Sequence, residues 1–246
     1  MSDLSTLVTY WTVLFGAGIY MSITGFGFGM ISTTILFLVF DPHTVVHSLA
    51  FPFIMATAFA FVQNRKDVIW AETLPYAALA LPGVLFATWV HPFVPTFAAQ
   101  LFLALLLFYA LFHASLPTFL RFLLRTPVSA TLAGFANGIL GTAGPPVIAW
   151  SVLKPWSPNV RRAATVCIFL VAGSFRTAAL CFEPRFEVQK QLIHCLYVAP
   201  AIFLGVWLGH RLSGYLSKKQ INILHQGGIF VLACVLLMKA VAPFVV

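Results

Sequence analysis

The stretch Gly138-Ile139-Leu140-Gly141-Thr142-Ala143-Gly144-Pro145-Pro146 interrupts an apolar segment that runs from residue 128 to residue 153. In the same way, Gly25-Phe26-Gly27-Phe28-Gly29 interrupts the apolar segment 7–40. As one helix, segment 7–40 would be ~50 Å long, too long for one crossing of a ~30 Å hydrocarbon core. Glycine opens backbone conformations that other residues avoid, and proline removes amide donors. The flanking pieces are mostly too short to cross alone, so each segment is predicted to be a broken span or a re-entrant hairpin with its tip in mid-membrane.

The composition indicates an integral membrane protein. Of the 246 residues, 61% are hydrophobic and only 8% are charged, whereas soluble domains carry about 25% charged residues. Six further segments have the length of ordinary spans, and proline within them is expected to kink a helix without ending it. These predicted spans are 43–62, 73–90, 97–112, 159–182, 191–209 and 221–241.

The net charge of +8 has two interpretations. Basic proteins often bind nucleic acid, but membrane proteins also carry an excess of Lys and Arg in their cytoplasmic loops. The charges of this chain lie mostly in short loops between apolar segments, so we predict a lipid bilayer and no nucleic acid as partner.

The sequence indicates no metal, cofactor or enzymatic chemistry. The four cysteines, Cys167, Cys181, Cys195 and Cys234, show no CxxC pair and no Cys/His ligand spacing. No nucleophile–base pair is visible among the predicted spans.

The chain also repeats itself. A shift of 116 residues places Gly18 on Gly134 and Gly25 on Gly141, and it also matches Pro42 with Pro158 and Phe53 with Phe169. After a six-residue insertion a shift of 122 places Gly83 on Gly205. We interpret the chain as two homologous halves, 1–120 and 121–246.

The positions of Lys and Arg favour inverted halves. If both broken segments are hairpins, one side of the membrane holds ten Lys and Arg and the other holds three, counted from the sequence. If both segments cross fully, the split is seven against six. We therefore predict an all-α polytopic membrane protein of two inverted repeats, each a broken or re-entrant helical hairpin plus three spanning helices. Both termini are then non-cytoplasmic.

Inverted repeats with interrupted helices are a common transporter design, with the substrate near the midplane where the interruptions meet. A helix N-terminus there offers unpaired amides and a dipole that favours anions. All six acids lie in loops or at helix ends, so the intramembrane carboxylate typical of cation carriers is missing from the predicted spans. The predicted substrate-binding residues are Ser22, Thr24, Gly25, Gly27, Gly29, His47, Asn137, Gly141, Thr142, Gly144, Pro145 and Arg176.

Three of these residues have a second interpretation. Arg176 lies within a span and either binds an oxyanion or extends its guanidinium to the nearby interface. His47 could titrate during transport, although a packing histidine is the commoner case. Asn137 could donate to the substrate or cap a half-helix.

The duplicated break, Gly25–Gly29 and Gly138–Pro146, each followed by a loop that ends in proline (Pro42, Pro158), resembles the sulfite exporter TauE/SafE family of membrane permeases over essentially the whole chain. The resemblance implies outward transport of sulfite, sulfoacetate or a related organosulfonate across the cytoplasmic membrane. An anion channel or importer on the same scaffold, or a non-transporting assembly subunit, stays open as an alternative. A homodimer is expected only by analogy with other transporters.

Overall fold

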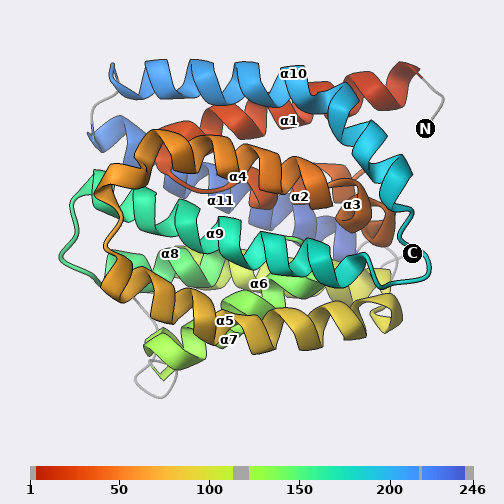
Figure 1. The fold of residues 1–246 in the computed structure, drawn as a ribbon, viewed down its shortest axis with the longest axis horizontal. Coiled ribbons are helices and arrows are strands. Elements are labelled where there is room, and N and C mark those ends of the chain that lie inside the picture. Colours follow the sequence, from red (N-terminus) through yellow and green to blue (C-terminus); the bar gives the residue numbers. More distant parts are fainter. Residues whose placement is uncertain (1–3, 113–121, 216–217, 242–246) are drawn as a thin grey trace.

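The computed structural model describes residues 4–112, 122–215 and 218–241, and every regular element within them is helical (Figure 1). The first predicted broken segment forms α1 (Leu4–Thr24) and α2 (Phe28–Phe37). The second forms α7 (Thr126–Leu140) and α8 (Gly144–Val152). The predicted interruptions at the two glycine runs are confirmed.

Left-handed glycines end the first helix of each pair. Gly25, Gly27 and Gly141 have φ angles of 87°, 99° and 71°, and no other residue in the described ranges has a positive φ. The Gly25 amide donates to the Met21 carbonyl (2.7 Å) and the Gly141 amide donates to the Asn137 carbonyl (2.9 Å). Each glycine thus closes the last turn of its helix and lets the chain change direction where a side chain would be strained.

Both broken segments fold back on themselves. The ring of Phe40, just after α2, lies 5.4 Å from the ring of Tyr10 in the first half of α1. At the other hairpin, Trp150 Nε1 near the end of α8 donates to Thr126 Oγ1 at the start of α7 (3.1 Å). The second helix of each pair therefore returns toward the end at which the first one began.

The pieces beside the breaks are mostly too short to cross a membrane alone, as predicted, and α1 is the exception. Helix α1 has 21 residues and is long and apolar enough to cross a membrane alone, so the pieces beside the first break are not both short. Helices α2, α7 and α8 have 10, 15 and 9 residues. Helix α1 reaches this length because it begins at Leu4, before residue 7, where the apolar segment marked in the sequence starts.

The six ordinary predicted spans are all helical. They correspond to α3 (Pro42–Ser48) with α4 (Ala50–Asn64), α5 (Trp70–Val90), α6 (Thr96–Phe112), α9 (Pro158–Leu180), α10 (Val188–Ser213) and α11 (Lys218–Val241). In the described residues, four helices are long and apolar enough to cross a membrane, and the α3–α4 pair makes a fifth. The protein is a multi-pass membrane protein.

The first ordinary span is bent. Residues 43–62 were expected to form one kinked helix, but α3 and α4 meet at Leu49 with a 45° bend. Pro52 explains the position, because a proline cannot donate to the carbonyl four residues earlier and its ring crowds that carbonyl, here that of Ser48. The bend leaves carbonyls at the end of α3 available to other partners.

Matched glycines bring the two halves into close contact. Gly134 on α7 packs against the Ala80 carbonyl of α5, and Gly83 on α5 packs against the Thr131 carbonyl of α7. On the other side of the bundle, Gly205 on α10 packs against the Phe15 carbonyl of α1. The first helix of each hairpin is therefore held by a helix of the other half (Figure 1).

We predict that Gly134→Ala destabilises the protein, because its new Cβ would collide with the Ala80 carbonyl. Overpacking of this kind costs about 1–3 kcal/mol. Gly16→Ala is the matched control, since it lies in the interior of α1 with open space around the added Cβ. Thermal unfolding of the two variants in detergent measures the difference, and equal melting temperatures would contradict the close approach of α5 and α7.

Candidate functional site

The two breaks meet in a small cavity inside the bundle. Its walls come from both hairpins and from α4 and α9: Met21, Gly27, Phe28, Gly29, Phe53, Thr57, Thr142, Ala143, Gly144 and Phe169 line it. Thr33 Oγ1 of α2 donates to the Leu140 carbonyl of α7 (3.3 Å) across the junction. The cavity volume is about 10 Å³, which is room for about one water.

The two breaks contribute unequal numbers of amide donors. The amides of the first turn of a helix have no intrahelical partner, and in α2 these belong to Phe28, Gly29 and Met30. In α8 the corresponding turn begins Gly144-Pro145-Pro146, and proline has no N–H. The Gly144 amide is already directed at Thr142 Oγ1 (3.4 Å). Amide binding of an anion therefore depends on the N-terminus of α2.

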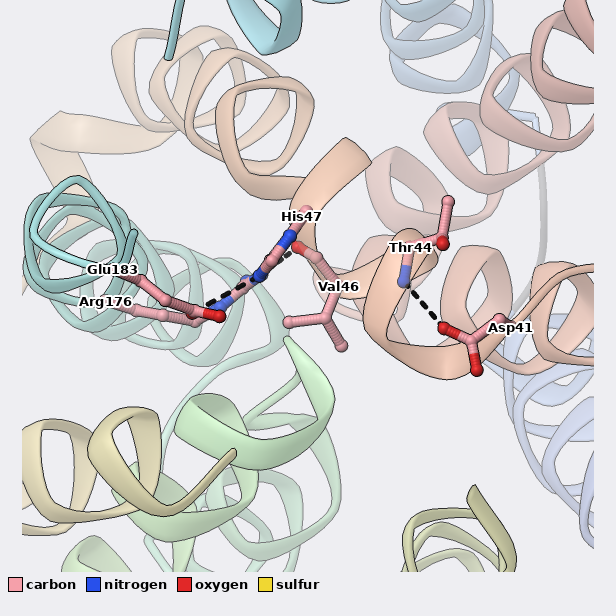
Figure 2. Close-up of polar contacts among 6 residues, drawn as sticks. All are labelled: Asp41, Thr44, Val46, His47, Arg176 and Glu183. Carbon is pink, nitrogen blue, oxygen red and sulfur yellow. Dashed lines mark hydrogen bonds and ion pairs between the residues drawn. The ribbon is translucent and has the colours of Figure 1, made fainter. Parts of the chain in front are cut away.

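Arg176 lies next to the second break and is completely buried. Its Nη2 donates to the Val46 carbonyl at the end of α3 (Figure 2). A Cβ added to Gly141 would lie 2.9 Å from Nη1, so the guanidinium packs directly on that glycine. The expectation that this side chain extends to the interface is wrong. Arg176 is not one of the residues that line the cavity. The glycine on which it packs, Gly141, directly precedes the cavity-lining residue Thr142.

The Arg176 charge has no protein counter-ion in the described ranges. None of the ion pairs found there involves Arg176. Its Nε and Nη1 atoms are buried without a hydrogen-bond partner in that part of the chain. Burial of a charge without a partner costs several kcal/mol, so a group of opposite charge would stabilise this guanidinium.

Asn137 and Ser22 also present buried polar atoms. The Asn137 side chain is fully buried, and in the described residues neither its Oδ1 nor its Nδ2 has a partner. The α7 cap is made by its backbone carbonyl, so the side chain does not serve as the cap. Ser22 Oγ, near the end of α1, is likewise buried without a partner among described residues.

The remaining predicted site residues divide into two groups. Gly27, Gly29, Thr142 and Gly144 line the cavity. Four others do not line it: Thr24, Gly25, Pro145 and His47. Thr24 Oγ1 donates to the Tyr20 and Phe26 carbonyls (2.9 and 2.8 Å) and so builds the turn.

Sequence reasoning missed the aromatic walls of the cavity. Phe53 of α4 and Phe169 of α9 face it from the two halves, with ring centroids 6.4 Å apart. The 116-residue shift that matches these two phenylalanines was the available signal, because equivalent positions of two repeats can face one common site.

Helix α9 contacts both breaks. Near its start, Arg162 packs on Gly25 and its Nη2 donates to the Ile23 carbonyl (2.8 Å). Thr165 Oγ1 donates to the Gly25 carbonyl (3.0 Å). About one turn from its end, the same helix places Arg176 on the second break. These contacts satisfy carbonyls that the first break leaves exposed.

His47 lies outside the cavity, in α3, with Nε2 3.3 Å from Glu183 Oε2 in the turn after α9 (Figure 2). The two side chains are 12% and 11% exposed. His47 adjoins Val46, whose carbonyl accepts from Arg176. The pair therefore lies beside the second break without contacting the cavity.

Comparisons with known proteins agree with this architecture. The model of the family described as "Sulfite exporter TauE/SafE" matches residues 10–236. The chain is 24% identical over 246 residues, 94% of each chain, to a protein of Cupriavidus necator described as "Probable sulfite/organosulfonate exporter TauE". No solved structure matches the chain. Since the family match includes both breaks and nearly all of the helices, the chain belongs to the sulfite exporter TauE/SafE family of membrane transporters.

Proposed function

We propose that this protein exports a small sulfur-containing anion, sulfite or an organosulfonate such as sulfoacetate, across the cytoplasmic membrane. The anion binds where the two helix breaks meet. The observation that carries the proposal is the completely buried Arg176, with two guanidinium nitrogens that lack partners in the described part of the chain. The description of the Cupriavidus necator relative supplies the substrate class.

An oxyanion is the ligand that compensates this charge. A guanidinium presents N–H donors in a planar fork that matches the oxygens of a carboxylate, phosphate or similar oxyanion. The amides at the start of α2, which have no intrahelical partner, add donors from the other hairpin, and the helix dipole favours negative charge there. The buried Asn137 amide, a few residues before Gly141, supplies a neutral donor.

A cavity of about 10 Å³ holds one water and is smaller than any sulfur oxyanion. The described conformation is therefore a closed one, and substrate binding requires the hairpins to separate at the Gly29–Gly141 contact. That separation would bring Gly27–Gly29, Thr142 and Gly144 of the cavity wall into one space with Arg176.

The separation fits two inverted halves, 1–120 and 121–246, that move against each other. Reciprocal packing supports this part of the proposal, because α1 is held by α10 and α7 is held by α5. The two hairpins also open toward opposite ends of the bundle in Figure 1, while α1 begins and α11 ends at the same end. With the Lys and Arg distribution, this arrangement supports our proposal that both termini lie outside the cytoplasm.

Arg176→Met should weaken anion binding without loss of stability. Removal of charge-assisted hydrogen bonds worth about 1.5–3 kcal/mol weakens binding by at least about tenfold. Removal of an unpaired buried charge leaves the melting temperature unchanged or raises it. Calorimetric titration of sulfite and sulfoacetate into the purified protein, with the exposed Arg185→Gln as control, tests both points. Sulfite affinity equal to that of the original chain would refute the role of Arg176.

Gly144→Leu should fill the cavity and stop transport while the protein still folds. Gly144 has an ordinary φ angle, and the atom nearest to an added Cβ lies 3.6 Å away, so the backbone accepts a side chain. Gly27 is a poorer test, because its φ of 99° strains any side chain there. Efflux of radiolabelled sulfite from liposomes measures the effect. Gly16→Leu is the control, and equal efflux from both variants would exclude the cavity as part of the pathway.

A further inference from the structure

A second cluster of polar side chains lies outside the cavity. His47 of α3, His91 of the short helix η2 (His91–Phe93) after α5, and Glu183 in the turn after α9 each direct one ligand atom at the others. These three atoms lie within 4.8 Å of one another. The residues come from both halves of the chain, and His47 and Glu183 are 136 residues apart in sequence.

His91 makes this cluster more than an ion pair. Its side chain is 2% exposed, and Nδ1 is buried without a hydrogen-bond partner among the described residues. An unsatisfied buried polar atom costs about 1–3 kcal/mol. The ring also lies 4.7 Å from that of His43 and 5.7 Å from that of His47. A further atom bonded to His91 within the cluster would remove this cost.

From this arrangement we propose that His47, His91 and Glu183 bind one Zn²⁺ ion. Two imidazoles and one carboxylate are a zinc ligand set, whereas Mg²⁺ and Ca²⁺ prefer oxygen ligands alone. Two ligands at 2.0–2.1 Å on a tetrahedral zinc are about 3.3 Å apart. The observed 3.3 Å between His47 Nε2 and Glu183 Oε2 matches this spacing. Small rotations of the His91 side chain would bring its ligand nitrogen to the same spacing from the other two ligand atoms.

The surroundings provide access and set the charge. A groove of about 460 Å³, lined in part by Thr88, Pro92 and Glu183, opens beside the cluster and gives an ion a route from outside the bundle. The Glu183 carboxylate supplies one negative charge. Arg176 carries a positive charge that would repel a metal ion in the cluster. Its guanidinium donates to the carbonyl of Val46, the residue before His47. With three protein ligands, the fourth position is left for water or another small ligand.

The sequence predicted no metal site because the chain has no local Cys/His ligand spacing. That reasoning does not apply to this cluster. Its three ligands lie on separate segments that only the fold brings together. A bound ion would join α3, the end of α5 and the end of α9, next to the Arg176 contact. None of the three proposed zinc ligands lines the cavity. Zinc binding and anion transport can therefore be tested independently.

The test is calorimetric titration of Zn²⁺ into the full-length protein, purified in detergent through a tag without histidine and freed of metal with a chelator. We expect one saturable site. His91→Ala and Glu183→Gln should each weaken it by more than about 100-fold, because loss of a direct ligand exceeds the 10–100-fold cost of losing an outer partner. His210→Ala, at an exposed position in the last turn of α10, is the control and should bind as the original chain does.

A measurement on the unaltered chain keeps the proposal testable if a variant does not fold. X-ray absorption of the zinc-loaded protein should show nitrogen and oxygen neighbours alone. Sulfur in the zinc shell would assign the ion to the cysteines, of which Cys181 is exposed, and would overturn the proposal. No saturable binding, or binding unchanged in folded His91→Ala and Glu183→Gln, would overturn it as well.

Discussion

Each helix break within the membrane exposes backbone groups that lipid cannot hydrogen-bond, so the protein must supply partners for them. Here the partners are side chains of other helices. Arg162 and Thr165 bind the carbonyls of Ile23 and Gly25 at the first break. Thr33 of α2 binds the Leu140 carbonyl at the second. The breaks are therefore stable only when the two hairpins and α9 are assembled together.

The need to assemble both hairpins also brings residues 1–120 and 121–246 into close contact. Glycines on α1, α5, α7 and α10 let backbones approach until a methyl group would collide with a neighbouring carbonyl. Such small-residue contacts are the usual means of tight helix packing in lipid, where no hydrophobic force drives helices together. A small inward cavity, walled by both breaks, follows from this close packing. Under the proposed function, a substrate larger than this cavity would enter by a movement of one half against the other.

Arg176 connects the two polar regions of the protein. On one side its guanidinium packs on Gly141, whose carbonyl faces Gly29 of the first break. On the other it donates to Val46, next to His47 of the His47–His91–Glu183 cluster. A ligand in either region therefore lies close to the same buried charge. An anion would relieve that charge, whereas a metal ion would oppose it unless an anion or Glu183 compensates.

Hydropathy, glycine and proline by themselves determined the helical spans, the positions of both breaks and the family, because these are local signals along the chain. Only the tertiary structure decided which polar groups meet. The burial of Arg176 and the approach of His47, His91 and Glu183 depend on contacts between distant segments. The bend at Leu49 shows the limit between the two. Pro52 marks a kink in the sequence, but the partner of the nearby Val46 carbonyl is Arg176, 130 residues away. No local pattern encodes such a pairing, since it is chosen by the packing of whole helices.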